Sequence, residues 1–244
     1  MAKPILVIPC YNEEERLDCP AFETLLAGWD LLFVNDGSTD ATGDVIDAFA
    51  STESAVTTLH LAENRGKAEA VRAGLLEALD RGAGVVGYGD ADLATPPDEF
   101  QRLLAMLDDE AIACVLGSRV QLLGRNVERS RPRHWLGRLF ATAASALLDL
   151  PVYDTQCGAK VFRATPQLSC ALGEPFGARW AFDVELLGRL LVPLDGSAGL
   201  PQPAIVEVPL RSWRDVGGSK LSRRAMFQAL RDLARIGTDL RRRR

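Results

Sequence analysis

The sequence of 244 residues is poor in the side chains that bind zinc or form disulfide frameworks. It contains two histidines, and its five cysteines are an odd number at irregular spacings without a CxxC pair. A structural zinc site and a network of disulfides are therefore not expected. The longest apolar run, residues 140–148, is much shorter than the roughly 20 residues that cross a bilayer. Because no signal-peptide pattern opens the sequence, we expect a cytoplasmic protein.

Internal repeats, low-complexity tracts and linker-like changes of composition are also absent. Hydrophobic residues make up 47% and charged residues 25% of the chain, values that are typical of a globular domain. These values exclude a disordered or collagen-like protein, and a single domain of this length can bury a substantial core.

The net charge of −5 gives no reason to expect a nucleic-acid partner, but it averages two unlike parts. Residues 220–244 hold nine basic and two acidic side chains, a net charge of +7, which leaves −12 for residues 1–219. We predict one domain over 1–219 and a basic C-terminal helix over 220–244 that packs on it or extends from it. Apolar residues recur in this tail at helical spacing, namely Leu221, Met226, Phe227, Leu230, Leu233, Ala234 and Leu240. Two interpretations stay open: a helix that lies on an anionic membrane surface, or a helix packed on the core with a solvated end.

Short apolar runs alternate with helical patterns in the first half of the chain. Strands are expected at residues 4–9, 31–35, 56–61, 85–88 and 112–116, and helices at 13–27, from about 40, at 66–81 and at 97–107. The second half is less regular, with helices expected at 138–148 and 182–191, strands at 160–163 and 205–211, and a loop at 192–203. This order predicts an α/β fold with a mostly parallel sheet flanked by helices.

The carboxyl ends of the expected parallel strands carry polar residues, and ligands collect at that edge of such sheets. The clearest chemical signal there is Asp90-Ala91-Asp92, which follows the fourth strand. Two carboxylates one residue apart can reach the same divalent cation, and Mg²⁺ and Mn²⁺ prefer such oxygen ligands together with substrate phosphates. A DxD triplet alone is common, but its place after an apolar strand favours a metal site.

Two other strand ends suggest a nucleotide or phosphate site. Capping of the next helix explains residues 38–40, whereas Asp36 stands at the end of an apolar strand and can accept hydrogen bonds from a base or ribose. Arg65 and Lys67 stand at the start of a helix, where the helix dipole disfavours cations unless an anion lies between them. The alternative is a solvated surface pair.

Charged side chains occur in two unusual settings later in the chain. Asp183 and Glu185 stand in the apolar segment 180–187, where burial without partners would be costly, and this favours a functional role for Asp183. A basic stretch follows the fifth strand and comprises Arg119, Arg125, Arg129, Arg131, Arg133 and His134. It is either a solvated loop or the site of a second anionic group beside the metal.

Together these motifs resemble the family 2 glycosyltransferases of GT-A fold. The resemblance rests on residues 8–13 (IPCYNE), 35–38 (NDGS), 64–67 (NRGK), 90–92 (DAD) and 117–119 (GSR), which occur in the order of that family. The segment 154–162 (DTQCGAKVF) is similar to the polyprenyl- and dolichyl-phosphate sugar synthases within the family. Residues 180–187 and 213–221 (WRDVGGSKL) look closest to the dolichyl-phosphate β-glucosyltransferase branch.

The resemblance implies an inverting, metal-dependent enzyme that moves a sugar, glucose from UDP-glucose in this branch, onto a polyprenyl or dolichyl phosphate. It implies a donor nucleotide bound by Pro9, Tyr11, Glu13, Asp36, Lys67 and Asp90, and a Mg²⁺ or Mn²⁺ ion bound by Asp90 and Asp92. It further implies an acceptor and sugar pocket formed by Asp154, Gln156, Lys160, Glu185 and Lys220. The residues implied in catalysis are Asp92, Arg119, Arg133 and Asp183, of which the two arginines hold the acceptor phosphate.

Two positions depart from the mannose enzymes of this group, which have a glutamine in place of Ala94 and a serine in place of Gly137. A mannose donor is thereby put in doubt. The N-terminal membrane anchor of the eukaryotic glucose enzymes is not expected here. The alternatives are a family 2 enzyme that uses a saccharide or protein hydroxyl with Asp183 as the base, and a non-catalytic nucleotide-sugar-binding protein. The expected partners are a nucleotide sugar, a lipid phosphate and an anionic membrane surface on its cytoplasmic face.

Overall fold

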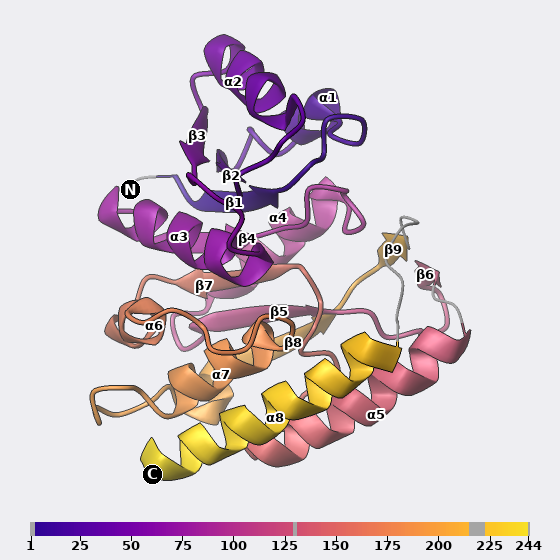
Figure 1. The fold of residues 1–244 in the computed structure, drawn as a ribbon, viewed down its shortest axis with the longest axis vertical. Helices are drawn as coiled ribbons and strands as arrows, with labels where there is room; N and C mark the ends of the chain where they lie inside the picture. Colours follow the sequence, from indigo (N-terminus) through magenta and orange to yellow (C-terminus); the bar gives the residue numbers. More distant parts are fainter. Residues whose placement is uncertain (1–2, 129–130, 215–222, 244) are drawn as a thin grey trace.

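A computed structural model describes residues 3–128, 131–214 and 223–243, without the side chains of 128, 131–136 and 223–227. Its centre is a seven-stranded sheet in the order β3-β2-β1-β4-β7-β5-β8 (Figure 1). The strands are β1 (Ile5–Cys10), β2 (Asp30–Asn35), β3 (Val56–His60), β4 (Val85–Tyr88), β5 (Cys114–Ser118), β7 (Lys160–Arg163) and β8 (Ile205–Pro209). Among them β7 alone runs antiparallel to its neighbours. A separate parallel pair consists of β6 (Asn126–Glu128) and β9 (Ser212–Arg214).

Helices cover both faces of the sheet. They are α1 (Cys19–Glu23), α2 (Thr42–Thr52), α3 (Lys67–Asp80), α4 (Pro97–Ala105), α5 (Arg131–Leu148), α6 (Pro166–Leu172), α7 (Phe182–Leu191) and α8 (Arg223–Arg243), with 3₁₀ turns η1 (Met106–Asp108) and η2 (Gln202–Ala204). Helix α3 packs on β1, β2 and β4, and α4 contacts β5 and β7. Helices α5 and α8 lie side by side at the bottom of Figure 1 and both contact α7.

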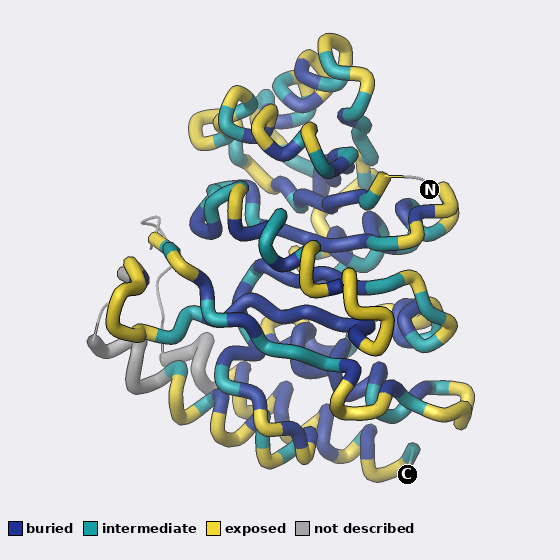
Figure 2. Tube along the Cα trace, turned by 180° about the vertical axis from the view of Figure 1, so that it is seen from behind, coloured by how far each residue is buried: buried dark blue, intermediate teal, exposed yellow. Residues whose placement is uncertain are grey.

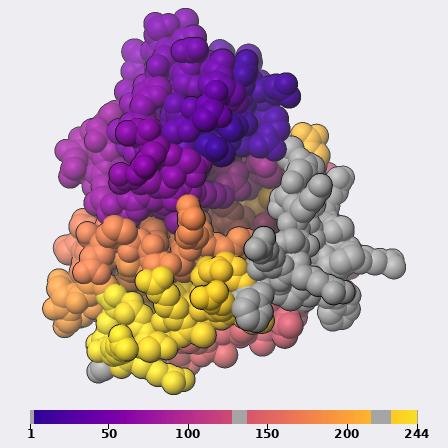
Figure 3. Space-filling view, viewed as in Figure 1, coloured from indigo at the N-terminus to yellow at the C-terminus, as the bar shows by residue number. Residues whose placement is uncertain are grey.

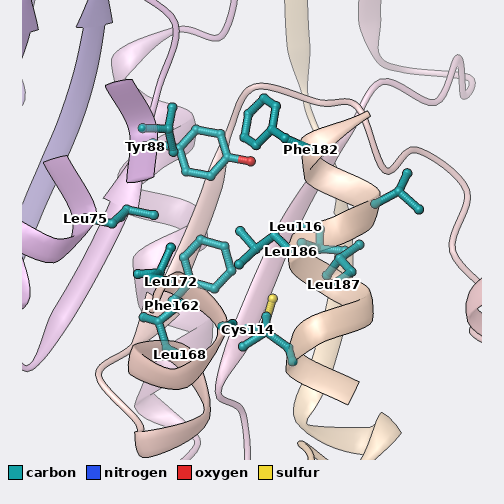
Figure 4. Close-up of a cluster of buried hydrophobic side chains, with 14 of the residues drawn as sticks. Leu75, Tyr88, Cys114, Leu116, Phe162, Leu168, Leu172, Phe182, Leu186 and Leu187 are labelled. Carbon is teal, nitrogen blue, oxygen red and sulfur yellow. The ribbon is translucent and has the colours of Figure 1, made fainter. Parts of the chain in front are cut away.

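Because helices cover both faces of the sheet, both faces are buried, and successive side chains of a strand enter opposite hydrophobic clusters. In β1, Ile5 and Val7 join one hydrophobic cluster, whereas Leu6 and Ile8 join the other. Figure 2 shows the strands as a dark blue, buried layer within the molecule. Figure 4 shows part of the first cluster, in which side chains of α3, α6 and α7 meet those of β4, β5 and β7.

The predicted α/β fold with a mostly parallel sheet is confirmed, but one predicted helix is wrong. The pattern over residues 13–27 predicts a single long helix, yet the helix there is the five-residue α1. It begins late because the Asp18 carboxylate accepts a hydrogen bond from the Ala21 amide at 3.1 Å and Pro20 stands in the first turn. Strands β6 and β9 and helix α6 were not expected, because such short segments carry too little periodicity.

The C-terminal helix α8 buries its apolar side in the protein. Ala229, Leu233, Ile236 and Leu240 are buried, and α8 contacts both α5 and α7. Gly188 of α7 leaves room for this contact, since a Cβ there would lie 2.9 Å from a Leu240 methyl carbon. Of the two interpretations of the tail, the structure therefore supports a helix packed on the core. The division of the chain between residues 219 and 220 stays a prediction. No helix in the described part of the chain is both long and apolar enough to cross a membrane.

We expect Leu233→Ala to lower the free energy of unfolding by about 2–5 kcal/mol, because it leaves a cavity between α8 and the helices beneath it. Leu230→Ala, on the exposed side of the same helix, is the matched control and should change that free energy by less than about 0.5 kcal/mol. Urea unfolding followed by circular dichroism measures both. Equal effects of the two substitutions would contradict the packing of α8.

Candidate active site

The loops after β1 and β2 are bonded to each other at the carboxyl edge of the sheet. Asn12 lies in the left-handed region (φ 53°), and its side-chain oxygen accepts a hydrogen bond from the Thr39 amide at 2.9 Å. The Asn12 amide in turn donates to Ser38 Oγ at 3.1 Å. Pro9 lies in β1 just before this loop, and Tyr11 within it is 44% exposed. The ring of Tyr11 therefore offers a flat apolar face to a base.

Asp36, expected to bind the nucleotide, is engaged with the protein backbone. One of its carboxylate oxygens accepts a hydrogen bond from the Arg65 amide and the other from the Gly66 amide, both at 2.8 Å. Asp36 thereby fixes the turn that leads into α3 and presents Lys67 at its start. Because each carboxylate oxygen can accept a further hydrogen bond, a contact between Asp36 and a nucleotide stays a prediction.

Glu13 has one oxygen that the protein leaves unused. Its Oε1 accepts a hydrogen bond from Arg16 at 2.7 Å, whereas Oε2 is buried without a partner among the described residues. Burial raises the pKa of this carboxyl, Arg16 opposes the shift, and the negative charge of Asp92 adds to it. A buried acceptor without a donor is costly, so a hydroxyl or N–H group of a ligand would be stabilised here.

Asp90 and Asp92 follow β4 and form the centre of the site. The ammonium of Lys67 pairs with Asp90. Burial is the largest single influence on Asp90 and acts to raise its pKa, but the charge and hydrogen bond of Lys67, together with the charges of Arg119 and Lys160, make the net shift downward. The pKa of Asp92 is raised, first by burial and then by the charge of Asp90. Asp92 accepts a hydrogen bond from the Ala94 amide at 3.0 Å, and the intervening Leu93 lies in the left-handed region (φ 51°).

These two carboxylates fit a divalent cation. A carboxylate whose pKa is raised by burial and by a neighbouring anion is stabilised by a cation that both can share. Within residues 3–128, 131–214 and 223–243, no group of three or more His, Cys, Asp or Glu side chains could hold a metal ion on its own. Asp90 and Asp92 would thus supply two oxygen ligands to Mg²⁺ or Mn²⁺, and phosphate and water oxygens would supply the others.

Gly158 leaves the space that the Asp90 carboxylate occupies. A Cβ at position 158 would overlap this carboxylate and would lie 2.5 Å from its Cγ. Asp90 lies 2 residues beyond β4, and Gly158 lies 2 residues before β7, its neighbour in the sheet. The segment 154–162 that the sequence singles out is therefore packed directly on a predicted metal ligand.

Asp183 and Lys160 form a buried ion pair within electrostatic reach of Asp90. The Lys160 Nζ donates to Asp183 Oδ1 at 2.5 Å and to a backbone carbonyl at 2.6 Å. The Tyr88 hydroxyl donates to the same oxygen of Asp183. Figure 4 shows Tyr88 beside Phe182, the residue that precedes Asp183. Because each charge has a partner, the cost of burying this carboxylate in an apolar segment is offset.

Arg119, one residue beyond β5, is held by Asp154. Its Nε and Nη2 donate to the two oxygens of that carboxylate at 2.7 and 2.8 Å. Glu207 of β8 fixes Asp154 in turn, because it accepts hydrogen bonds from the Tyr153 and Asp154 amides at 2.7 and 2.6 Å. The Arg119 guanidinium lies over the ring of Trp213, 5.4 Å from its centroid. No described residue bonds to Nη1 of Arg119, so the guanidinium can still meet an anion.

Two polar side-chain atoms that follow Asp154 in the sequence are buried without a hydrogen-bond partner in the described part of the chain. They are Thr155 Oγ1 and Gln156 Nε2. The Gln156 amide donates to Asp154 at 3.2 Å, which holds the segment beside the Arg119 pair. Sugar hydroxyls both donate and accept hydrogen bonds, so they are suitable partners for these atoms.

Of three remaining predicted site residues, the structure describes the side chain of Glu185 alone. Glu185 accepts hydrogen bonds from the two amides of residues 177–178, at 3.1 and 2.7 Å, and from Arg189 at 2.6 Å. It lines a groove of about 310 Å³ between α8 and residues 174–177, where the orange and yellow segments adjoin in Figure 3. Arg133 stands near the start of α5 and its side chain lies outside the described residues, as does Lys220 entirely. The roles of all three stay predictions.

No sequence pattern singles out Glu99 of α4, which fixes residues 211–212 beside Trp213. Its buried Oε1 accepts hydrogen bonds from the Arg211 and Ser212 amides at 2.6 and 3.1 Å, and its Oε2 accepts one from Arg102 at 2.5 Å. Glu99 thereby fixes the chain that leads into β9 and carries Trp213. A single carboxylate in an amphipathic helix gives no sequence signal for a contact 112 positions away.

We expect Gly158→Ala to weaken Mn²⁺ binding about 10–100-fold, because the added methyl group displaces the Asp90 carboxylate. Gly84→Ala is the matched control, since a Cβ there meets nothing within 4 Å. Titration of Mn²⁺ followed by electron paramagnetic resonance measures the affinity of both variants. Unchanged Mn²⁺ affinity of Gly158→Ala would show that Asp90 does not bind the ion in this position.

A family pattern and several curated relatives are similar to this chain. The pattern described as "Glycosyl transferase family 2" matches residues 5–166. A dolichyl-phosphate beta-glucosyltransferase of Drosophila melanogaster is 36% identical over 89% of this chain and 68% of its own length. A second protein of that name, from Trichomonas vaginalis, is 32% identical over 94% of this chain and 69% of its own length. An undecaprenyl-phosphate mannosyltransferase of Micrococcus luteus is 30% identical over 96% of this chain and 93% of its own length.

Solved structures of the same fold include S. aureus TarS in complex with UDP-GlcNAc. Its TM-score is 0.60 at 15% identity, and the alignment covers 96% of this chain. This chain spans 66% of the TarS chain, and at this identity the likeness concerns the fold alone. The GT-A fold expected from the motifs is thereby confirmed. With the family pattern matching most of its length, the chain belongs to glycosyl transferase family 2 and is a glycosyltransferase.

Proposed function

We propose that this enzyme transfers glucose from UDP-glucose to a polyprenyl phosphate of the dolichyl type, with inversion at the anomeric carbon. One observation carries the proposal. The Asp90–Asp92 pair lies at the same edge of one sheet as Arg119, which forms an ion pair with Asp154. A carboxylate pair suits a nucleotide diphosphate with its metal, and an arginine suits a second phosphate. The relatives named as dolichyl-phosphate beta-glucosyltransferases support this choice of sugar and acceptor.

On the donor side, Tyr11 would stack on the base, and the unused Glu13 oxygen would accept a hydrogen bond from the ribose or base. Lys67 would pair with the diphosphate. Asp90 and Asp92 would hold Mg²⁺ or Mn²⁺, which neutralises the charge of the departing diphosphate when bound. The protein residues bind and orient the donor so that its anomeric carbon faces the acceptor.

On the acceptor side, Arg119 would hold the lipid phosphate, together with Arg133. An oxygen of this phosphate forms the new bond to the anomeric carbon while the bond from that carbon to the diphosphate breaks on the opposite face. A phosphate is already an anion at neutral pH, so no strong base is required. Catalysis would then rest on positioning and on charge stabilisation. We infer that the enzyme works at the cytoplasmic face of the membrane that holds this acceptor.

The test is a panel of labelled nucleotide sugars with polyprenyl phosphate and Mg²⁺ or Mn²⁺. We expect chloroform-extractable label from UDP-glucose and little from GDP-mannose. Asp92→Asn should reduce this activity at least about 100-fold, because it removes a charged metal ligand. Asp98→Asn is the matched control, because Asp98 is an exposed aspartate nearby on α4, and this variant should retain the activity.

Label transferred from GDP-mannose alone would overturn the proposed donor. Label transferred only to saccharide or protein acceptors would overturn the proposed acceptor. If a nucleotide sugar binds, as measured by calorimetry, but no label is transferred to any acceptor, a non-catalytic nucleotide-sugar-binding protein would replace the enzyme that we propose.

We expect Glu99→Gln to raise the KM for the acceptor several-fold with little change in the KM for the donor. The side-chain amide of the introduced glutamine disrupts the hydrogen bonds that fix residues 211–212. These residues precede Trp213, on whose ring Arg119 lies. The free energy of unfolding should fall by about 1–3 kcal/mol. Glu110→Gln, an exposed change of the same kind, is the control. Equal changes in the two KM values would argue against a role confined to the acceptor side.

A further inference from the structure

The connection between β5 and β6 carries two adjacent leucines at an exposed turn. Leu123 is completely exposed and Leu122 is 48% exposed. The Arg125 amide donates to the Leu122 carbonyl at 3.1 Å, and Gly124 supplies the left-handed residue (φ 79°) that this turn requires. The turn is therefore closed by its own backbone, and it holds both leucines in water. Figure 2 shows this connection as an exposed stretch at the edge of the molecule.

Both sides of the turn are anchored to the protein. The Gln121 side chain donates to the Val127 carbonyl at 3.1 Å, and Val127 itself is buried. The Asn126 amide donates to the Arg211 carbonyl at 2.8 Å, where β6 joins β9. The place of the leucines relative to the site is thus set by hydrogen bonds on either side of them.

The same connection begins at Arg119, the arginine that Asp154 holds on the acceptor side. Leu122 lies three positions after Arg119, and at ~3.5 Å of chain per position at most, this path spans at most ~10 Å. Apolar side chains of interfacial segments reach roughly 5–10 Å into the boundary between headgroups and acyl chains. A leucine inserted there would leave Arg119 at the level of lipid phosphates. Arg125, exposed at the end of the turn, adds a positive charge beside the leucines that suits anionic headgroups.

We propose that Leu122 and Leu123 insert into the surface of the membrane that carries the acceptor. Arg119 can then bind the phosphate of a lipid that stays in the membrane. This inference rests on the proposed function for its choice of partner. The apolar side of α8 is packed in the protein, so the basic C-terminal helix does not offer an equivalent apolar surface among its described residues. The exposed leucine pair takes the role that the sequence suggested for the tail.

The first experiment measures binding to vesicles of phosphatidylcholine with a minority of phosphatidylglycerol. Burial of a leucine side chain changes a partition coefficient by about 10-fold or more. We therefore expect the double variant Leu122→Ser, Leu123→Ser to bind these vesicles at least about 10-fold more weakly than the wild type. Met106→Ser, on an exposed hydrophobic residue of η1, is the matched control and should bind like the wild type. Because both leucines are exposed, thermal unfolding of the double variant should be unchanged.

The second experiment compares two acceptors, a long polyprenyl phosphate embedded in those vesicles and a short, water-soluble isoprenyl phosphate. We expect the double variant to lose about 10-fold or more of the rate with the embedded acceptor and to keep the rate with the soluble one. Wild-type vesicle binding and wild-type rates with both acceptors would overturn the proposal. Equal losses with both acceptors would also overturn it, because they would indicate a defect within the site. If the wild type transfers no sugar but its vesicle binding depends on the leucines, the proposed function fails and the membrane contact stands.

Discussion

The antiparallel direction of β7 is the constraint on which the site depends. Because β7 runs against its neighbours, its first residue, Lys160, lies beside Tyr88, the last residue of β4, and beside Leu116 of β5. A parallel strand in that place would put its last residue there instead. Lys160 is completely buried, so its charge requires the carboxylate of Asp183. This ion pair ties α7 to the edge of the sheet at which Asp90 stands.

A short second sheet couples the two sides of the site. The Arg214 amide of β9 donates to the Ala94 carbonyl at 3.1 Å, and the Ala94 amide donates to Asp92. The residue before Arg214 is Trp213, on which the Arg119 guanidinium lies. The three-residue strand β9 therefore contacts both the loop of a predicted metal ligand and Arg119. A displacement of β9 would move this loop and Arg119 together. The buried carboxylate of Glu99, which binds the amides at the start of β9, prevents such a displacement.

The sequence predicts the parts of this protein that depend on local patterns. Strands β4 and β7 and helix α7 match their predicted bounds, because apolar runs and helical periodicity end at clear breakers. The Asp90–Asp92 pair is placed correctly for the same reason, since it follows a strand end. Contacts between distant segments have no such signal. The space that Gly158 leaves for Asp90, and the bonds of Asp36 to the Arg65 and Gly66 amides, follow from the register of neighbouring strands and loops, which a pattern along the chain does not encode.

The pairing of Asp183 bears on the class of acceptor. A hydroxyl acceptor needs a base, and Asp183 was the residue that the sequence offered for that role. In the structure one oxygen of this carboxylate accepts hydrogen bonds from both Lys160 and Tyr88. This carboxylate is the counter-ion of the fully buried ammonium of Lys160, so it is already engaged within the protein. A phosphate acceptor is already ionised and needs no base. It needs a cation, and in the proposed function this cation is Arg119, which Asp154 and Trp213 hold in place. This pairing supports the proposed phosphate acceptor over a hydroxyl acceptor.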